Sequence, residues 1–188
     1  WENLKVSLDG YETQIYLPSD SIFNSPPVDF VLKQETIVPE VDSAKFAEIA
    51  QQAEENYELI QHMINVARQN EVVSIPEGIH TISKPIVINN KINITIQGIL
   101  SSGIILNDIH QPVLIINNSS NIVLQRLHLG HDTSIIGDRD SEVLRINKGN
   151  NIYINSCEVS GYAAIGVKAV EVKSLTIVNC FVHDNSWF

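Results

Sequence analysis

The chain has few aromatic residues, no long apolar run and no visible signal peptide. Aromatic residues make up 6% of its 188 residues, so the core must be aliphatic rather than aromatic. No stretch reaches the roughly 18 consecutive apolar residues that a membrane span requires, so we expect no transmembrane segment. The chain begins at Trp1 rather than Met, which favours a processed product whose signal peptide has been removed.

Basic residues are also scarce. The chain holds 12 Lys and Arg against 22 Asp and Glu, a formal net charge of −10. Residues 1–71 contain 13 of those acids, so the negative charge is concentrated in the front section. Binding to nucleic-acid phosphates needs clustered Lys and Arg, and we therefore expect no nucleic-acid partner.

There are only two cysteines, Cys157 and Cys180, which is too few for a zinc site of the finger type. Both fall at one position of a repeated motif, where Ile99 and Leu127 stand in the earlier repeats. We expect all four to be buried apolar residues in one stacked column. A disulfide between adjacent coils stays open as an alternative, although in-register strands about 4.8 Å apart do not obviously suit its crossed dihedral.

The motif recurs four times with its apolar positions intact. Its copies are Asn93–Ile99, Asn121–Leu127, Asn151–Cys157 and Ser174–Cys180. Their starts are 28, 30 and 23 residues apart. Self-similarity at this period is typical of a solenoid, in which each repeat buries its apolar face only against its neighbours.

Each motif is accompanied by two further short strands. The preceding strands are Ile86–Asn89, Leu114–Asn117, Leu144–Asn147 and Val167–Val170, and the following strands are Ile99–Ser101, Leu127–Leu129, Cys157–Val159 and Cys180–Val182. Three strands per coil with a side-chain period of two predict a parallel β-helix. Asn89, Asn117 and Asn147 then form an asparagine ladder at one turn.

The spacing of apolar residues divides the chain into three segments. Residues 1–41 contain short alternating runs, among them Val28–Leu32, that read as antiparallel strands or an extended arm. Residues 42–71 carry apolar residues at helical spacing and predict an amphipathic helix that caps the solenoid. Residues 72–188 form the coils, which stop without a visible closing cap, so we expect further coils or a subunit at that end.

The entry to the coils consists of a helix, a strand ending in Pro-x-Gly and then the first coil, over Tyr57–Ala67, Val72–Gly78 and Pro85–Ile88. This arrangement resembles the entry to the coils in the pectin-lyase-like superfamily. The resemblance implies an all-β solenoid, a right-handed parallel β-helix with three strands per coil and a helical cap. The superfamily includes lyases, hydrolases, epimerases and noncatalytic surface proteins. The motifs of polygalacturonases, pectate lyases and mannuronan epimerases are missing here.

Arg145 and Lys168 hold outward positions on adjacent coils, so we expect them to be neighbours. In a β-elimination, Lys168 could act as base while Arg145 stabilises the enolate-like charge. The longest insertion, residues 131–140, leads into the Arg145 strand. It adds His131 and Arg139 as candidate substrate contacts, and Asp132, Asp138 and Asp140 as candidate ligands of a calcium ion. The alternative is a solvated turn with internal ion pairs.

A second candidate cluster follows the motif. His128 and Glu158 share an outward position on adjacent coils and could form an acid–base pair or a surface hydrogen bond. His183 lies in the last coil beside Asp184 and is a further candidate substrate contact.

The favoured interpretation is a secreted, periplasmic or cell-surface β-helix that binds an acidic polysaccharide or cleaves it by β-elimination. A noncatalytic structural or adhesive solenoid is the alternative. Glycoside hydrolysis by Glu158 and Asp140 is a weaker one, because it needs two carboxylates about 5–9.5 Å apart across a groove.

Overall fold

The computed structural model describes residues 2–8, 11–17, 43–132, 141–161 and 165–185. The chain divides into two compact units, residues 1–41 and residues 42–188. In the first unit, β1 (Glu2–Leu8) pairs in antiparallel fashion with β2 (Tyr11–Leu17). The strand predicted at Val28–Leu32 lies outside the described residues.

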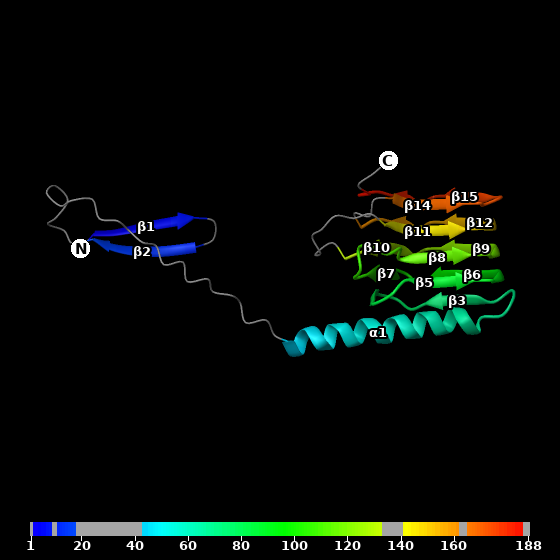
Figure 1. Ribbon diagram of the computed structural model, residues 1–188, viewed down its shortest axis with the longest axis horizontal. Coiled ribbons are helices and arrows are strands. Elements are labelled where there is room, and N and C mark those ends of the chain that lie inside the picture. The colour runs from blue at the N-terminus through cyan, green and yellow to red at the C-terminus, as the bar shows by residue number, and fades with distance from the viewer. Residues whose placement is uncertain (1, 9–10, 18–42, 133–140, 162–164, 186–188) are drawn as a thin grey trace. The chain divides into compact units, whose positions relative to one another are not determined.

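The second unit is a parallel β-solenoid of about four turns with three strands per coil (Figure 1). The first sheet contains β4 (Ile79–Ile82), β7 (Gly103–Leu106), β10 (His128–His131), β13 (Glu158–Val159) and β16 (Phe181–Val182). The second contains β5 (Ile86–Asn89), β8 (Leu114–Asn117), β11 (Glu142–Asn147) and β14 (Ile165–Val170). The third contains β3 (Val72–Ile75), β6 (Ile92–Gly98), β9 (Ser120–Gln125), β12 (Asn150–Asn155) and β15 (Leu175–Val178).

The core is built from aliphatic columns that run along the solenoid. In the third sheet Ile96, Leu124, Ile154 and Ile177 pair in register from coil to coil. The second sheet stacks Ile88, Ile116 and Ile146 in the same way, all three fully buried. The expected stacking of each repeat's apolar face on its neighbours is therefore confirmed. Burying each such side chain contributes roughly 1.5–3 kcal/mol relative to leaving it in water.

One column differs from the prediction. Four residues, Ile99–Ser102, connect β6 to β7, whereas two connect β9 to β10. The strand predicted at Ile99–Ser101 is therefore wrong, and β7 begins at Gly103. The backbone N–H of His128 donates to the carbonyl of Ser102, so buried Ser102 takes the column position expected for Ile99. Ile99 is instead 45% exposed on the loop.

Two asparagine ladders hold the corner between the second and third sheets. In the predicted ladder, the Asn147 amide donates to Asn117 Oδ1 at 2.9 Å. A second ladder stands beside it, with Asn121 Nδ2 at 2.6 Å from Asn93 Oδ1 and Asn151 Nδ2 at 2.8 Å from Asn121 Oδ1. The residues of this second ladder have φ of 53° or 54°, a left-handed conformation that asparagine tolerates well.

Helix α1 (Ser43–Val66) closes the β3 end of the solenoid (Figure 1). Its buried Ile60 and Ile64 belong to the same core as the coils. Gln61 does what a neighbouring strand would do for β5: its amide donates to the Val87 carbonyl at 2.9 Å and its Oε1 accepts from the Val87 N–H at 2.8 Å. The predicted helical cap is thus confirmed, and it covers both the apolar core and a strand edge.

At the other end, the core-side residues of the last described coil are partly or largely exposed. Val167 is only partly buried, Ile177 is 41% exposed and Ala169 is exposed, although the sequence places all three on the core side. The thiols of Cys157 and Cys180 are both free. Burial raises the pKa of Cys157 to about 11, so this thiol stays protonated near neutral pH. Among the described residues, no helix combines the length and apolar character needed to cross a bilayer.

Candidate functional site

The outer face of the first sheet brings together the pair that the sequence singled out. His128 of β10 pairs in register with Glu158 of β13, which pairs in turn with Phe181 of β16. Because side chains alternate along a strand, these three residues share one outward row. His128 Nε2 lies 3.9 Å from Glu158 Oε1, so the prediction that these two residues are neighbours is confirmed.

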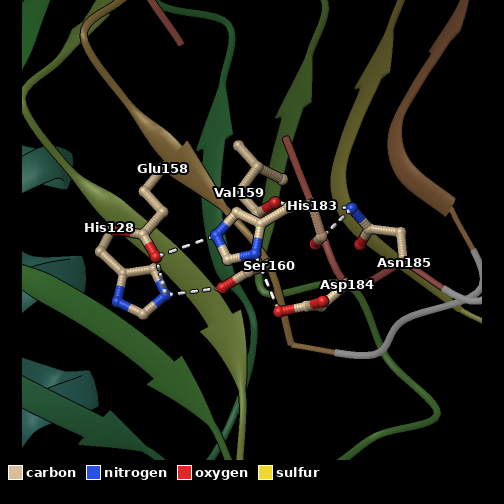
Figure 2. Close-up of polar contacts among 7 residues, drawn as sticks. All are labelled: His128, Glu158, Val159, Ser160, His183, Asp184 and Asn185. Carbon is tan, nitrogen blue, oxygen red and sulfur yellow. Dashed lines mark hydrogen bonds and ion pairs between the residues drawn. The ribbon is translucent and has the colours of Figure 1, made fainter. Parts of the chain in front are cut away.

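Figure 2 shows how Glu158 is held from the last coil. His183 Nε2 lies 3.1 Å from Glu158 Oε1, and His183 Nδ1 lies 2.9 Å from Asp184 Oδ2. The hydrogen bond to Asp184, followed by the one to Glu158, raises the pKa of His183 above its ordinary value of 6.5. Each ring nitrogen of His183 thus faces a carboxylate oxygen, and the protonated ring would donate to both Glu158 and Asp184.

His128 has a second polar partner. Its Nε2 lies 2.9 Å from Ser160 Oγ, and Ser160 is almost fully buried (Figure 2). Gly130, two residues along β10, leaves the room for this contact. A Cβ there would meet the Ser160 carbonyl at 2.9 Å and His128 Nε2 at 3.2 Å. The glycine therefore lets the imidazole lie against the sheet, in reach of both Ser160 and Glu158.

A groove of about 430 Å³ opens beside this pair. Its lining comprises Ile79, Leu100, Ser101, Ser102, Arg126, Leu127, His128, Ser156 and Glu158. The Ile99–Ser102 loop contributes one wall, which is why the four-residue connection matters for the site. Arg126 stands at the corner with φ of 55°, and its Nη2 donates to Gln97 Oε1 at 2.9 Å. Sequence reasoning missed Arg126, although its place two residues before His128 was a usable signal.

Arg145 and Lys168 lie on a different sheet, the second, and pair in register as predicted. A residue that the sequence analysis overlooked joins them: the carboxylate of Glu142 accepts from Lys168 Nζ at 2.7 Å and from Arg145 Nε at 3.0 Å. Burial acts to raise the pKa of Glu142, but the hydrogen bonds from Lys168 and Arg145 outweigh it and hold that pKa below its ordinary value. The signal was its spacing, three residues before Arg145.

The remaining predicted contacts lie elsewhere. His131 is 2% exposed, with Nε2 at 2.7 Å from the Gln111 carbonyl, so its side chain is buried rather than on the outer face. The Asp132 backbone N–H donates to the Leu106 carbonyl. Asp138, Arg139 and Asp140 are outside the described residues. The part of the chain that the structure describes contains no group of three or more His, Cys, Asp or Glu placed to hold a metal ion. Calcium at Asp132, Asp138 and Asp140 therefore stays a prediction.

No family model, curated protein or solved structure matches this chain. The fold is thus defined by the chain's own strand pairing: a parallel β-solenoid with three strands per coil and a helix at its first end. The site is defined by chemistry alone. Arg126 offers a cation, His128 an imidazole and Glu158 a carboxylate, all lining one groove.

Proposed function

We propose that this chain is an extracytoplasmic, pectin-lyase-like β-helix whose first sheet binds an acidic polysaccharide and cleaves it by β-elimination. One observation carries the proposal: the groove beside β10 and β13 gathers Arg126, His128 and Glu158. A cation, a base and a carboxylate in one open groove are the groups that uronate elimination needs.

Arg126 is the group that neutralises the uronate carboxylate, which makes the proton on the adjacent carbon more acidic. His128 removes that proton. The electron pair left behind forms a carbon–carbon double bond, and the bond to the glycosidic oxygen breaks. That oxygen takes a proton from water and leaves as a hydroxyl. Glu158, 3.9 Å from His128 Nε2, stabilises the imidazolium formed in the step.

In this scheme Arg145 and Lys168 do not act as catalytic groups. Lys168 Nζ donates a hydrogen bond to the Glu142 carboxylate at 2.7 Å, so this side chain is held on the second sheet, away from the groove. Both cations are partly exposed, so they remain candidates for holding carboxylates of the polymer away from the reacting bond. A calcium ion at the 131–140 insertion would serve the same binding role.

A noncatalytic structural or adhesive solenoid is the second candidate. The contacts of Glu142 with Lys168 and Arg145 favour this candidate, because two cations compensated by one buried carboxylate suit a stable surface as well as a binding site. In that case the solenoid would bind glycans without changing them, or bind none.

The test is incubation with polygalacturonate, alginate and glycosaminoglycans, with and without calcium, while following the ultraviolet absorbance of the unsaturated product. We expect His128→Ala to reduce the rate at least a hundredfold with binding retained. Arg126→Ala should weaken binding as well as rate. Lys173→Ala, which removes an exposed cation at another corner, is the matched control and should change neither.

Three outcomes separate the candidates. Product formation that depends on His128 supports the lyase. Binding without product supports the noncatalytic solenoid. No binding to any of the three polymer classes contradicts the lyase and leaves the structural solenoid.

A further inference from the structure

The outward row of the first sheet continues past the groove to an exposed aromatic ring. Phe181 of β16 is in register with Glu158, which is in register with His128. Phe181 is 64% exposed. Parallel strands lie about 4.8 Å apart, so Phe181 stands roughly 10 Å from His128 along the solenoid axis, with Glu158 between them.

The ring of Phe181 contacts a neighbouring ring. It stacks on the imidazole of His183, with ring centroids 4.0 Å apart and an interplanar angle of 26°. His183 is itself fixed by Glu158 on one nitrogen and Asp184 on the other. One side of the exposed phenyl ring therefore packs on an imidazole that contacts two carboxylates, which reduces the conformational entropy lost when a ligand packs on the phenyl ring.

Phe181 and its neighbour Val182 both lie on β16, the last strand of the first sheet, but their side chains face opposite ways. Val182 pairs with Val159 in an inward column, and it is 47% exposed because no described strand covers that end of the core. Phe181 belongs to the outward row, which faces away from the core in every coil. Phe181 is therefore a residue of the outer surface, whereas Val182 is a core-side residue at the last described coil.

We propose that Phe181, stacked on His183, is an aromatic subsite that receives one pyranose ring of an acidic polysaccharide lying along the solenoid axis. This inference rests on the proposed function and deepens it. The negative face of the phenyl ring attracts the partly positive C–H hydrogens on the apolar face of a sugar. The neighbouring sugar then lies over Glu158 and His128, with its carboxylate toward Arg126. The substrate class is a uronate polymer whose rings present an axial C–H face.

The experiment is calorimetric titration of the whole chain with oligogalacturonate and with alginate oligosaccharides. We expect Phe181→Leu to weaken binding about five- to tenfold, because it removes the ring and keeps an apolar side chain of similar reach. Phe181→Tyr keeps the ring and should bind within about twofold of the unmodified chain. Val182→Ala, one residue along the same strand but on the inward side, is the matched control and should leave the affinity unchanged.

The outcomes distinguish this inference from the function on which it rests. If the unmodified chain binds neither oligosaccharide, the proposed function falls and the subsite with it. If it binds and Phe181→Leu binds equally well, the groove is a binding site but Phe181 is no part of it. If Val182→Ala weakens binding as much as Phe181→Leu, the effect comes from the last coil as a whole and the subsite is contradicted.

Discussion

The two ends of the solenoid bury the same kinds of residue to very different degrees. At the first end, α1 places Ile60 and Ile64 on the core, where they are 1% and 0% exposed. At the other, Ile177 occupies the same column as Ile154, yet Ile177 is 41% exposed and Ile154 is 1% exposed. The difference shows that a coil's core is buried only by its neighbours, since residues of one type and register change exposure with what lies beside them.

The last coil is held to the preceding one by polar contacts as well as by strand pairing. Lys168 of β14 reaches Glu142 of β11, and His183 reaches Glu158 of β13. Both carboxylates belong to the inner coil, and the Lys168 and His183 side chains to the outer. Polar side-chain contacts therefore join the last coil to its neighbour, whereas α1 covers the first coil by apolar burial.

The largest expected effect comes from removing a core side chain between two coils. Ile116→Ala, in the middle of the second sheet's column, should lower the free energy of unfolding by about 3–4 kcal/mol, because it leaves a closed cavity. Ile177→Ala should cost less than about 1 kcal/mol, since its side chain is already part-exposed. Urea denaturation of both variants measures the difference. Equal losses would contradict burial by nearest neighbours.

A smaller effect is expected from the charge contact between β11 and β14. Glu142→Gln removes the charge that Lys168 and Arg145 share, and should lower the free energy of unfolding by about 1–2 kcal/mol after allowing for solvent screening of the two cations. Lys84→Gln, at the exposed pair with Glu54 near the closed end, is the comparison variant and should cost less than Glu142→Gln does, because solvent screens an exposed ion pair. A larger loss at Lys84 than at Glu142 would reverse the contrast between the ends.

The smallest effect is a pH dependence confined to the last coil. Because the pKa of His183 is raised above 6.5 in the folded chain, its contacts stabilise the coil fully below that pH, and the stabilisation is lost as pH rises through the raised value. Hydrogen exchange of the Phe181 and His183 amides, which donate to Cys157 and Val159, should therefore speed up from pH 6 to 8 beyond its intrinsic increase. In Asp184→Asn the extra acceleration should shrink. If Asp184→Asn shows the same extra acceleration of exchange as the unmodified chain, titration of His183 is not the cause of that acceleration.

The sequence could predict the solenoid because period-two alternation and a recurring motif report the core directly. Ile88, Ile116 and Ile146 lie where their spacing placed them. So do the neighbours His128 and Glu158, because register follows once the columns are aligned.

The site was harder to predict because it depends on where the chain leaves that regular pattern. The Ile99–Ser102 loop moves Ser102 into the core and opens the groove, which no spacing rule anticipates. Glu142 was overlooked because a buried carboxylate resembles any other strand-end acid until its two cations are in place. Arg126 was overlooked because its left-handed corner conformation, and hence its direction, is not encoded in residue type.

The most direct test of the account is the footprint of oligogalacturonate on the backbone amide spectrum of the chain. We predict that the largest shifts fall on Arg126, His128, Glu158 and Phe181, the outer face of the first sheet and its groove. Shifts confined to Arg145 and Lys168 on the second sheet, or a spectrum that the oligosaccharide leaves unchanged, would contradict it.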